Sequence, residues 1–486
     1  MDSQPWRRTL GAIGLVVVAV ASLTGVAPPA EAVGSACSTS GTWRQGELNV
    51  YWFDVEQGDA QLVVGPTGKT MLIDLGETAW NSTGTSTMAS KVASKIRAIC
   101  GVSGPVHLDY VMASHHHLDH IGYAANPNDT STVGNGIYRL LTPGGENFSV
   151  GTVLDRDAGT WTDANGDSDC DVGTSASPAP ETEWRNAGTV SQTARRWNCW
   201  LYGPASQADR ANINGHVVRL GNSSPWPAID LGAGVTASIV QANAKGVVQI
   251  DGVTPVSGNH VGEPTPPSEN DYSIGVKFTR GAFEYATAGD SDGEYDTSGF
   301  GYTYNDIEQS MIAGFGNVET MRANHHGSLH SSKSTYVKAL APETAFISCG
   351  ANSYGHPGNR VLDALRTVPN ERGAGADIYL ANRPCDPQQS DGTATDYAGA
   401  LNSDGDVRLA TVGHPCLVCS SATPGCREST RTSPPNASRQ PPPRGKQPKL
   451  SPTQASRAGT WRDVRKAMAG RYPKHRWPEH PRSPTG

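Results

Sequence analysis

The sequence lacks an excess of basic residues. It has 39 Lys and Arg against 46 Asp and Glu in 486 residues, a formal net charge of −7. A protein that tracks along nucleic acid normally presents Lys and Arg to the phosphates, so this balance disfavours such a role without excluding it. The sequence also lacks an internal repeat. Its 36% hydrophobic content, with 55 Gly and 34 Pro, indicates one large, loop-rich globular domain rather than a membrane or disordered protein.

The basic residues that are present concentrate at the C-terminus. From Arg427 onward there are 14 Lys and Arg and three acids, so this segment carries +11 and the rest of the chain −18. Its prolines and scarce apolar residues predict a disordered tail over 427–486. Two interpretations of the tail remain. It contacts an anionic polymer such as cell wall or nucleic acid, or it is a solvated extension without a binding role.

A long apolar run, Leu10 to Ala27, lies near the N-terminus directly after Trp6-Arg7-Arg8. A basic start, an apolar stretch and the small-x-small sequence Ala30-Glu31-Ala32 are typical of a signal peptide, here residues 1–32. We therefore expect a secreted, extracellular protein. An uncleaved anchor is the alternative, although the run is near the lower limit of the roughly 17–25 residues that span a bilayer.

Nine cysteines follow the proposed cleavage site. An exported chain normally pairs its cysteines, and an odd count leaves one over. Cys416-x-x-Cys419 lacks a second pair of this kind, so a structural role is favoured over a redox or zinc site. The connectivity is open, and proximity in the sequence favours three pairings: Cys37 with Cys100, Cys170 with Cys199, and Cys349 with Cys385.

The segment Ser114-His115-His116-His117-Leu118-Asp119-His120-Ile121-Gly122 crowds potential metal ligands behind an apolar run. It predicts a strand that leads into a metal-binding turn. His115 and His117 alternate, so both side chains can point the same way from an extended segment. Asp119 and His120 follow at the start of the next helix and can face a second ion. A surface histidine cluster is the alternative interpretation.

At these residues the chain resembles the metallo-β-lactamase superfamily, whose fold carries a His-x-His-x-Asp-His motif at a strand-to-helix junction. Further motifs resemble one branch, typified by the ComEC hydrolase domain and by secreted phosphorylcholine esterases, although that branch usually has Gly where Glu56 stands. The resemblance implies an α/β fold, the αββα four-layer sandwich, as a catalytic domain over residues 45–420. In chain order the motifs are Phe53 to Ala60, Met71 to Gly76, Asn270 to Ser273, Ala288-Gly289-Asp290, His325-His326-Gly327-Ser328 and Gly355-His356-Pro357.

A Gly-Asp pair at the end of an apolar strand leaves the Asp290 carboxylate at the strand tip, where its two oxygens can bridge two cations. Zn²⁺ suits mixed imidazole and carboxylate ligands, and a catalytic site keeps open positions for water. We therefore expect two Zn²⁺ ions, or other divalent metals in their place. The expected ligands are His115, His117, Asp290 and one of His325 or His326 for the first ion, and Asp119, His120, Asp290 and His356 for the second.

The sequence does not decide which histidine of the pair His325-His326 binds metal. We take His326 as the ligand and His325 as a catalytic residue that stabilises charge or protonates a leaving group. Asp119 is the second catalytic candidate, because it can hold the nucleophile as well as the metal. The resemblance places Asp74 at a strand end near the site, where we expect it to hold a ligand histidine in position. For His356, an ordinary turn residue before proline is the alternative.

Residues 123–233 exceed what a minimal family member has, and we expect an ordered insertion there. Its aromatic residues are expected to fill a small satellite core or to wall a substrate cleft. Within it, acidic and amide side chains alternate as in calcium loops, but the expected Gly at position six and Glu at position twelve are missing, so Ca²⁺ is a weak candidate. The aromatic residues are Trp161, Trp184, Trp197, Trp200 and Tyr202, and the calcium candidates are Asp163, Asn165, Asp167 and Asp169.

Apolar spacing along the chain predicts both strands and helices. The expected strands are 48–53, 60–64, 71–74, 108–113, 153–154, 235–240, 273–278, 284–288, 321–323 and 344–348. The expected helices are 89–99, 308–312, 335–341 and 360–365.

The resemblance favours an exported metal-dependent hydrolase in which a hydroxide bridging two ions attacks a phosphoester. The expected substrate is a small-molecule, cell-wall or nucleotide phosphodiester, and no specific protein partner is indicated. A lactonase or β-lactamase is the alternative enzyme. A non-catalytic binding module on the same fold is the alternative of another class, but burying this many His and Asp side chains without metal would be costly.

Overall fold

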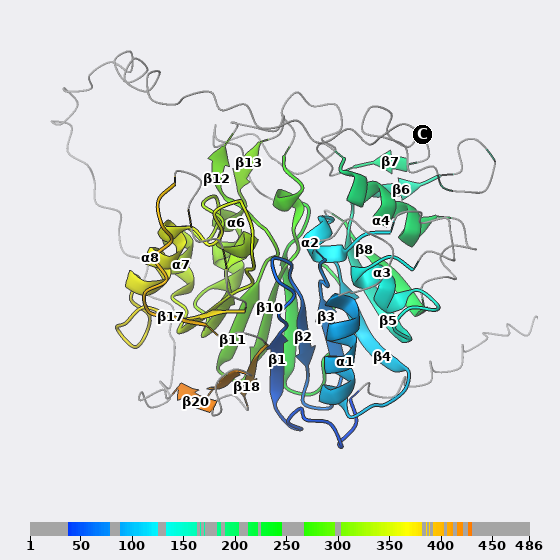
Figure 1. Cartoon of the computed structure of the whole chain (residues 1–486), viewed down its shortest axis with the longest axis horizontal. Coiled ribbons are helices and arrows are strands. Elements are labelled where there is room, and N and C mark those ends of the chain that lie inside the picture. The colour runs from blue at the N-terminus through cyan, green and yellow to red at the C-terminus, as the bar shows by residue number, and fades with distance from the viewer. Residues whose placement is uncertain are drawn as a thin grey trace, which may run out of the picture. The chain divides into compact units, whose positions relative to one another are not determined.

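Two β-sheets form the centre of the protein, which we describe from a computed structural model (Figure 1). The described residues are 37–77, 88–124, 133–162, 166, 170, 182–185, 190–203, 212–221, 225–244, 267–296, 303–381, 385, 388, 392–402, 406–411, 416–420 and 426–429. The expected signal peptide, the four calcium candidates, the side chains of Cys416 and Cys419, and the tail from residue 430 lie outside them. Every helix among the described residues is too short or too polar to cross a bilayer.

The first sheet has nine strands in the order β20-β19-β18-β1-β2-β3-β4-β5-β8. Strands β3, β4, β5 and β8 run parallel to one another, and the other neighbours are antiparallel. Its strands are β1 (Leu48–Trp52), β2 (Gln61–Val64), β3 (Thr70–Ile73), β4 (Val106–Met112), β5 (Phe148–Arg156), β8 (Ile213–Leu220), β18 (Val407–Thr411), β19 (Cys416–Ser420) and β20 (Cys426–Ser429).

The second sheet has seven strands in the order β17-β16-β15-β14-β11-β10-β9, of which β11, β14, β15, β16 and β17 are parallel. These are β9 (Val235–Gln241), β10 (Gly275–Arg280), β11 (Phe283–Thr287), β14 (Thr320–Arg322), β15 (Thr344–Ile347), β16 (Asp377–Leu380) and β17 (Ala400–Asn402). Two small ribbons pair β6 (Gly159–Trp161) with β7 (Thr182–Trp184) and β12 (Gly293–Asp296) with β13 (Tyr304–Asp306).

Helices cover the outer faces of the sheets. One buried cluster joins the first sheet to α1 (Met88–Cys100), α3 (Gly136–Leu141) and α4 (Gln192–Tyr202). A second joins the other sheet to α6 (Ile307–Phe315), α7 (Ser334–Leu340) and α8 (Asn359–Thr367). Figure 1 shows α1 and α3 over the strands on one side of the molecule and α6, α7 and α8 on the other.

The third buried cluster lies between the two sheets. Trp52 of the first sheet stacks on Phe346 of the second, with ring centroids 3.7 Å apart. Strand β2 shows why both faces are apolar: Leu62 and Val64 belong to the helix-side core, whereas Val63 belongs to the core between the sheets. Successive side chains of a strand point to opposite faces, so a strand that is covered on both sides must be apolar throughout.

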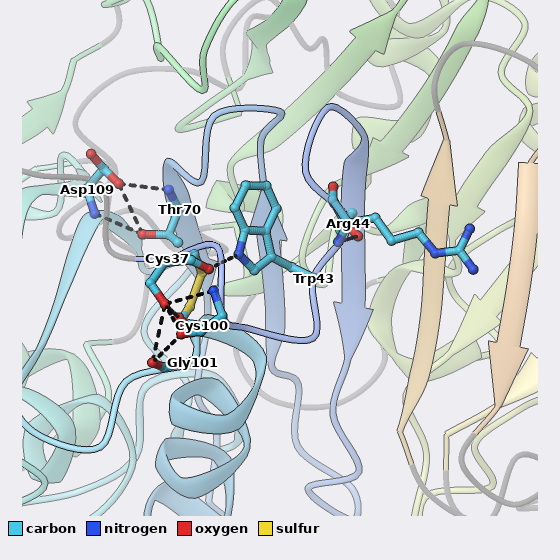
Figure 2. Close-up of a disulfide and its surroundings, with 10 residues drawn as sticks. Cys37, Trp43, Arg44, Thr70, Cys100, Gly101 and Asp109 are labelled. Carbon is cyan, nitrogen blue, oxygen red and sulfur yellow. Dashed lines mark hydrogen bonds between the residues drawn. A yellow bond between two sulfur atoms is a disulfide. The ribbon is translucent and has the colours of Figure 1, made fainter.

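The three cysteine pairs favoured by proximity are disulfides in the structure: Cys37–Cys100, Cys170–Cys199 and Cys349–Cys385. The first ties the segment before β1 to the end of α1 (Figure 2). Beside it, Trp43 Nε1 donates to Ser38 O at 2.7 Å, and the amide of Thr70 donates to Asp109 Oδ2 at 2.8 Å. The amides of Ser38 and Thr42 donate to the carbonyls of Cys100 and Ile99, so the segment before β1 is anchored on the end of α1.

All the expected strands and helices are present, with ends that differ by a few residues. Three features of the 123–233 stretch were not anticipated. Strands β5 and β8 are part of the main first sheet, α4 is a helix of 11 residues, and Trp197 and Trp200 belong to the core under that sheet rather than to a separate satellite core. The stretch is therefore built into the domain, because its apolar side chains share the core with α1 and α3.

Candidate metal centre

The candidate site lies where the parallel strands of both sheets end. Asp74 follows β3, Ser114 follows β4 and Asp290 follows β11, while His325 and Ser348 follow β14 and β15. Carboxyl ends of parallel strands lie along one edge of a sheet, and ligands bind in α/β proteins outside that edge. The two sheets therefore bring residues that are far apart in sequence to one place.

The metal turn, Ser114–Gly122, leads from β4 into the short helix α2 (Leu118–Ile121). His117 is the N-cap of α2, which places Asp119 and His120 in its single turn. Gly76 packs against the backbone of Asp119 so closely that a Cβ at Gly76 would lie 1.6 Å from the Asp119 carbonyl oxygen. The turn is thus pressed against the loop after β3, which explains a glycine at that position.

The second sheet supplies four further residues, which we call the second-sheet set: Asp290, His325, His326 and His356. His325 and His326 lie in the 3₁₀ segment η2 (Asn324–Gly327) with φ of 49° and 52°. Left-handed backbone is rare for residues other than glycine and is stored mainly at functional sites. This conformation sends the two adjacent imidazoles in different directions, as their contacts below show.

Four imidazoles converge on one oxygen atom, Oδ2 of Asp290. The Nε2 atoms lie 3.1 Å (His120), 3.5 Å (His326), 3.9 Å (His115) and 3.9 Å (His325) from it. His117 joins through Nδ1, which is 3.0 Å from His115 Nε2. Nitrogen atoms of neutral imidazoles gain little by meeting each other, whereas a divalent cation is stabilised by several of them together with a carboxylate.

The opposite ring nitrogens of three of these histidines have acceptors. His120 Nδ1 lies 2.8 Å from Asp74 Oδ2, His325 Nδ1 lies 3.0 Å from Asp292 Oδ1, and His326 Nδ1 lies 2.9 Å from the Ser348 carbonyl. A hydrogen bond from Nδ1–H fixes the tautomer and orients Nε2 as the atom available to a metal. Each of these three hydrogen bonds therefore orients the Nε2 atom of its ring toward the candidate site.

Asp74 holds more than one group. Its Oδ1 accepts from the amide of Ser114 at 2.7 Å, and its Oδ2 accepts from Ser114 Oγ at 2.7 Å as well as from His120. Asp74 itself has φ of 57°, which Asp tolerates better than most residues. The carboxylate thus links Ser114, at the start of the metal turn, to His120.

Negative charge dominates the electrostatics of the site. Burial lowers the pKa of His115 well below its usual value and that of His325 to about 4. Burial acts the same way on His326, but the carboxylates of Asp290 and Asp119 outweigh it and raise its pKa to about 9. Asp290 and Asp74 likewise raise the pKa of His120 well above its usual value. Carboxylates that hold protons on buried imidazoles also favour a bound cation.

Asp119, His120, Asp290 and His326 form one group whose ligand atoms all lie within 4.8 Å of one another. His120, His326 and Asp290 are buried, whereas the Asp119 side chain is 31% exposed and marks the side open to solvent. The mixture of imidazole and carboxylate donors fits a divalent transition metal such as zinc, iron or manganese. These buried His and Asp side chains can hold a metal ion.

The structure differs from the prediction in which histidine lies nearest to Asp119 and His120. His326, not His356, completes the group with Asp119 and His120, because its Nδ1 is held by Ser348 and its Nε2 lies 3.3 Å from Asp119 Oδ2. His356 stays at the edge of the site, with its ring centroid 5.2 Å from that of His325 and 6.3 Å from that of His326. The ring order could not be predicted from spacing, because it depends on the left-handed backbone of η2.

Sequence reasoning missed a buried arginine at the centre. Arg322, at the end of β14, is 1% exposed; its Nε lies 2.9 Å from Asp59 Oδ2, and its guanidinium reaches Asp290 Oδ1 at 3.5 Å. It also donates to the Gly289 carbonyl. Arg322 therefore occupies one oxygen of Asp290 and leaves Oδ2 toward the imidazoles. A charged residue in the middle of the expected strand 321–323 was the available signal.

Asp292 and His116 were also missed. Asp292 follows Asp290 by two residues, so the carboxylate pair in Gly289-Asp290-Ser291-Asp292 was a visible sign. His116 lies between two expected ligands, yet its Nε2 points to Asp155 at 2.7 Å. The rings of His115 and His117 meet each other at 3.0 Å while the His116 ring meets Asp155, so His116 contacts the scaffold instead of the site.

Comparisons with known proteins are partial. A family model described as ATP-dependent helicase C-terminal matches residues 454–481, which lie outside the described residues. ComE operon protein 3 of Bacillus subtilis (strain 168) is 30% identical over 106 residues, which are 21% of this chain and 12% of that protein. The crystal structure of CmlA, a diiron beta-hydroxylase from Streptomyces venezuelae, is 13% identical with a TM-score of 0.31, covering 69% of this chain and 53% of that one.

The structural likeness has too low a TM-score to carry an argument, and the chain spans only a small part of its curated relative. The chain's own structure shows a mixed α/β protein with two sheets and a buried His and Asp cluster able to hold metal at their shared edge.

Proposed function

We propose that this protein is an exported, metal-dependent hydrolase of the metallo-β-lactamase αββα type, acting on phosphodiesters. The order of the buried clusters, with helices outside each sheet and a core between the sheets, supports the fold assignment. Three disulfides support export, because such bonds persist in oxidising surroundings. The partial match to ComE operon protein 3 agrees with the proposed branch.

One observation carries the proposal: the Nε2 atoms of His115, His120, His325 and His326 surround Asp290 Oδ2 at 3.1–3.9 Å. A carboxylate in that position is suited to bridge two cations. We assign His115, His117, His325 and Asp290 to the first ion, and Asp119, His120, His326 and Asp290 to the second. His325 takes a ligand role here because Asp292 holds its Nδ1 and leaves Nε2 toward Asp290.

Two divalent ions at this place would supply an activated water and stabilise the charge that develops on the substrate. The chain's own residues perform the remaining tasks. Asp119, on the open side, orients the attacking water through its second carboxylate oxygen. His356 lies beside His325 but is not one of the four imidazoles that converge on Asp290 Oδ2. We therefore propose that it contacts the leaving oxygen of the substrate. The helices and the buried clusters beneath them exclude water from the side of the site that faces the protein interior.

Metal analysis and a substrate panel test the proposal. We expect two ions per chain and hydrolysis of bis-p-nitrophenyl phosphate or p-nitrophenyl phosphorylcholine in preference to nitrocefin and a lactone. His325→Ala and His326→Ala should each lose one ion, whereas His356→Ala should keep both and slow an alkyl phosphodiester more than an activated nitrophenyl ester.

Different results would redirect the assignment. Turnover of only the lactone or nitrocefin would replace the phosphodiesterase proposal with carbonyl hydrolysis. Two bound ions without any turnover would favour a binding module.

A further inference from the structure

His116, between the two histidines assigned to the first ion, is held on three sides. Its amide donates to Glu269 Oε1 at 2.9 Å, and its carbonyl accepts from Thr193 Oγ1 at 2.7 Å. Its Nε2 lies 2.7 Å from Asp155 Oδ1. Backbone and side chain of this one residue are therefore both fixed, by partners from three separate parts of the chain.

Helix α4 contributes one direct partner of His116 and two residues that act through Asp155. Besides Thr193 it provides Trp197, whose Nε1 donates to Asp155 Oδ1 at 3.1 Å, and Tyr202, whose hydroxyl donates to Asp155 Oδ2 at 2.7 Å. The helix starts at a cap in which Ser191 Oγ accepts from the amide of Ala194 at 3.0 Å. Cys199 in its third turn forms the disulfide with Cys170.

Rearrangement of these hydrogen bonds would cost free energy, because the groups involved are buried. His116 and Asp155 are fully buried, and Thr193 is 2% exposed. A buried carboxylate that loses one of its donors is costly, so Asp155 holds its three donors in place. Glu269 is similarly tied, because Arg156 Nε donates to the same oxygen that accepts from His116, at 2.7 Å.

We propose that α4 is a positioning element for the metal turn: by clamping His116 it aims the imidazoles of His115 and His117 at the first ion. The rings of His115 and His117 meet each other, with Nε2 and Nδ1 3.0 Å apart, whereas the His116 ring meets Asp155. Because His115 and His117 are the covalent neighbours of His116, a fixed backbone and ring at His116 limits where both neighbours point. The inference rests on the proposed function only in that it needs an ion at His115 and His117. Helix α4, which belongs to the 123–233 stretch, would thus have a function that neither the composition nor the motifs of that stretch indicate.

A matched pair of variants at Thr193 tests the clamp. Thr193→Val keeps the shape but removes the hydroxyl that binds the His116 carbonyl, while Thr193→Ser retains the hydroxyl. Tyr202→Phe removes one donor from Asp155 as an independent second variant. Trp200→Phe is the control, because Trp200 packs in the same core on Tyr138 and Trp197 without contacting His116 or Asp155.

The measurements are ions per chain, zinc affinity of each site by chelator competition, and the absorption spectrum of the cobalt-substituted protein. Thr193→Val and Tyr202→Phe should weaken the first ion by roughly 10–100-fold, the usual result of losing an outer partner, and leave the second ion bound. Thr193→Ser should restore the wild-type affinity and cobalt spectrum. Trp200→Phe should lower the melting temperature without separating the two affinities.

The inference is overturned if folded Thr193→Val and Tyr202→Phe proteins bind both ions as the wild type does, or if Trp200→Phe weakens the first ion equally. If the wild type itself binds fewer than two ions, the proposed function fails first, and the clamp fails with it.

Discussion

The metal turn and the second-sheet set contribute to one site in contrasting ways. The turn packs four candidate ligands, His115, His117, Asp119 and His120, into six consecutive positions at the end of β4. The second-sheet set draws Asp290, His325, His326 and His356 from the ends of three different strands. Local spacing organises the first region, whereas packing of β11, β14 and β15 organises the second.

The two regions are also held differently. The turn is anchored from its own sheet by Asp74 after β3 and Asp155 of β5, and from outside that sheet by Thr193 and Glu269 on its backbone. The second-sheet histidines are held from within their own sheet, by Asp292 after β11 and by the Ser348 carbonyl after β15. A local motif thus still depends on distant support, and dispersed ligands can be supported locally.

Asp290 is where the two regions meet, so its loss should have the largest effect. Asp290→Ala removes the oxygen shared by four imidazoles, and we expect both ions to be lost, with more than the roughly 10–100-fold drop in affinity that follows loss of an outer partner. Elemental analysis measures this, with the exposed Asp363→Asn as control. Retention of one tightly bound ion would show that the regions bind metal independently.

Arg322 should be the next most sensitive position, since it joins the second-sheet set to the first sheet through Asp59. Arg322→Met leaves Asp59 and one oxygen of Asp290 buried without their cation, and removal of one partner from a buried pair typically costs about 3–5 kcal/mol. Urea unfolding should show a loss of that order. A loss below about 1 kcal/mol, the range of exposed pairs, would contradict the assigned role.

Asp74 and Asp292 are matched supports, one in each region. Asp74→Asn should weaken the ion bound by His120, and Asp292→Asn the ion bound by His325, each by roughly 10–100-fold. Asn tolerates the positive φ of residue 74, so the backbone should persist. Chelator competition resolves the two ions, and the same ion weakened by both variants would refute the ligand assignment.

Glu308 predicts a pH dependence of stability in the second region. It is fully buried, accepts from Asn324 Nδ2 at 2.8 Å and from the amide of Lys333 at 3.1 Å, and burial raises its pKa from 4.5 to about 8. The folded state therefore binds a proton that the unfolded chain releases above pH 4.5. Stability from this residue is present at low pH and is lost as pH rises to about 8.

The slope should reach at most about 1.4 kcal/mol per pH unit within that window. Glu308→Gln should flatten the dependence of unfolding free energy on pH, and Glu284→Gln, on a partly exposed strand position, should not. Equal slopes for the wild type and Glu308→Gln would show that Glu308 titrates normally in the folded protein.

Much of the scaffold was predictable because apolar alternation is a local property. Strands such as β2 and β3 and helix α1 follow from spacing along the chain, and the three disulfides agree with the pairs that proximity favoured among an open set of pairings. Helix α4 was missed although Ala194, Trp197 and Leu201 recur at helical spacing, because most of its other residues are polar and only contact with α3 and the first sheet shows that it is buried. Arg322 was missed because its partners are brought near it by the packing of both sheets.

By itself the sequence determined that several His and Asp side chains with the chemistry of metal ligands stand within six positions after one strand, because residue type and spacing are properties of the chain alone. Only the tertiary structure decided how the ligands are shared. His325 and His326 are neighbours in sequence, yet the left-handed backbone of η2 directs one to Asp292 and the other to the Ser348 carbonyl. That choice depends on two loops from other strands, which spacing along the chain does not encode.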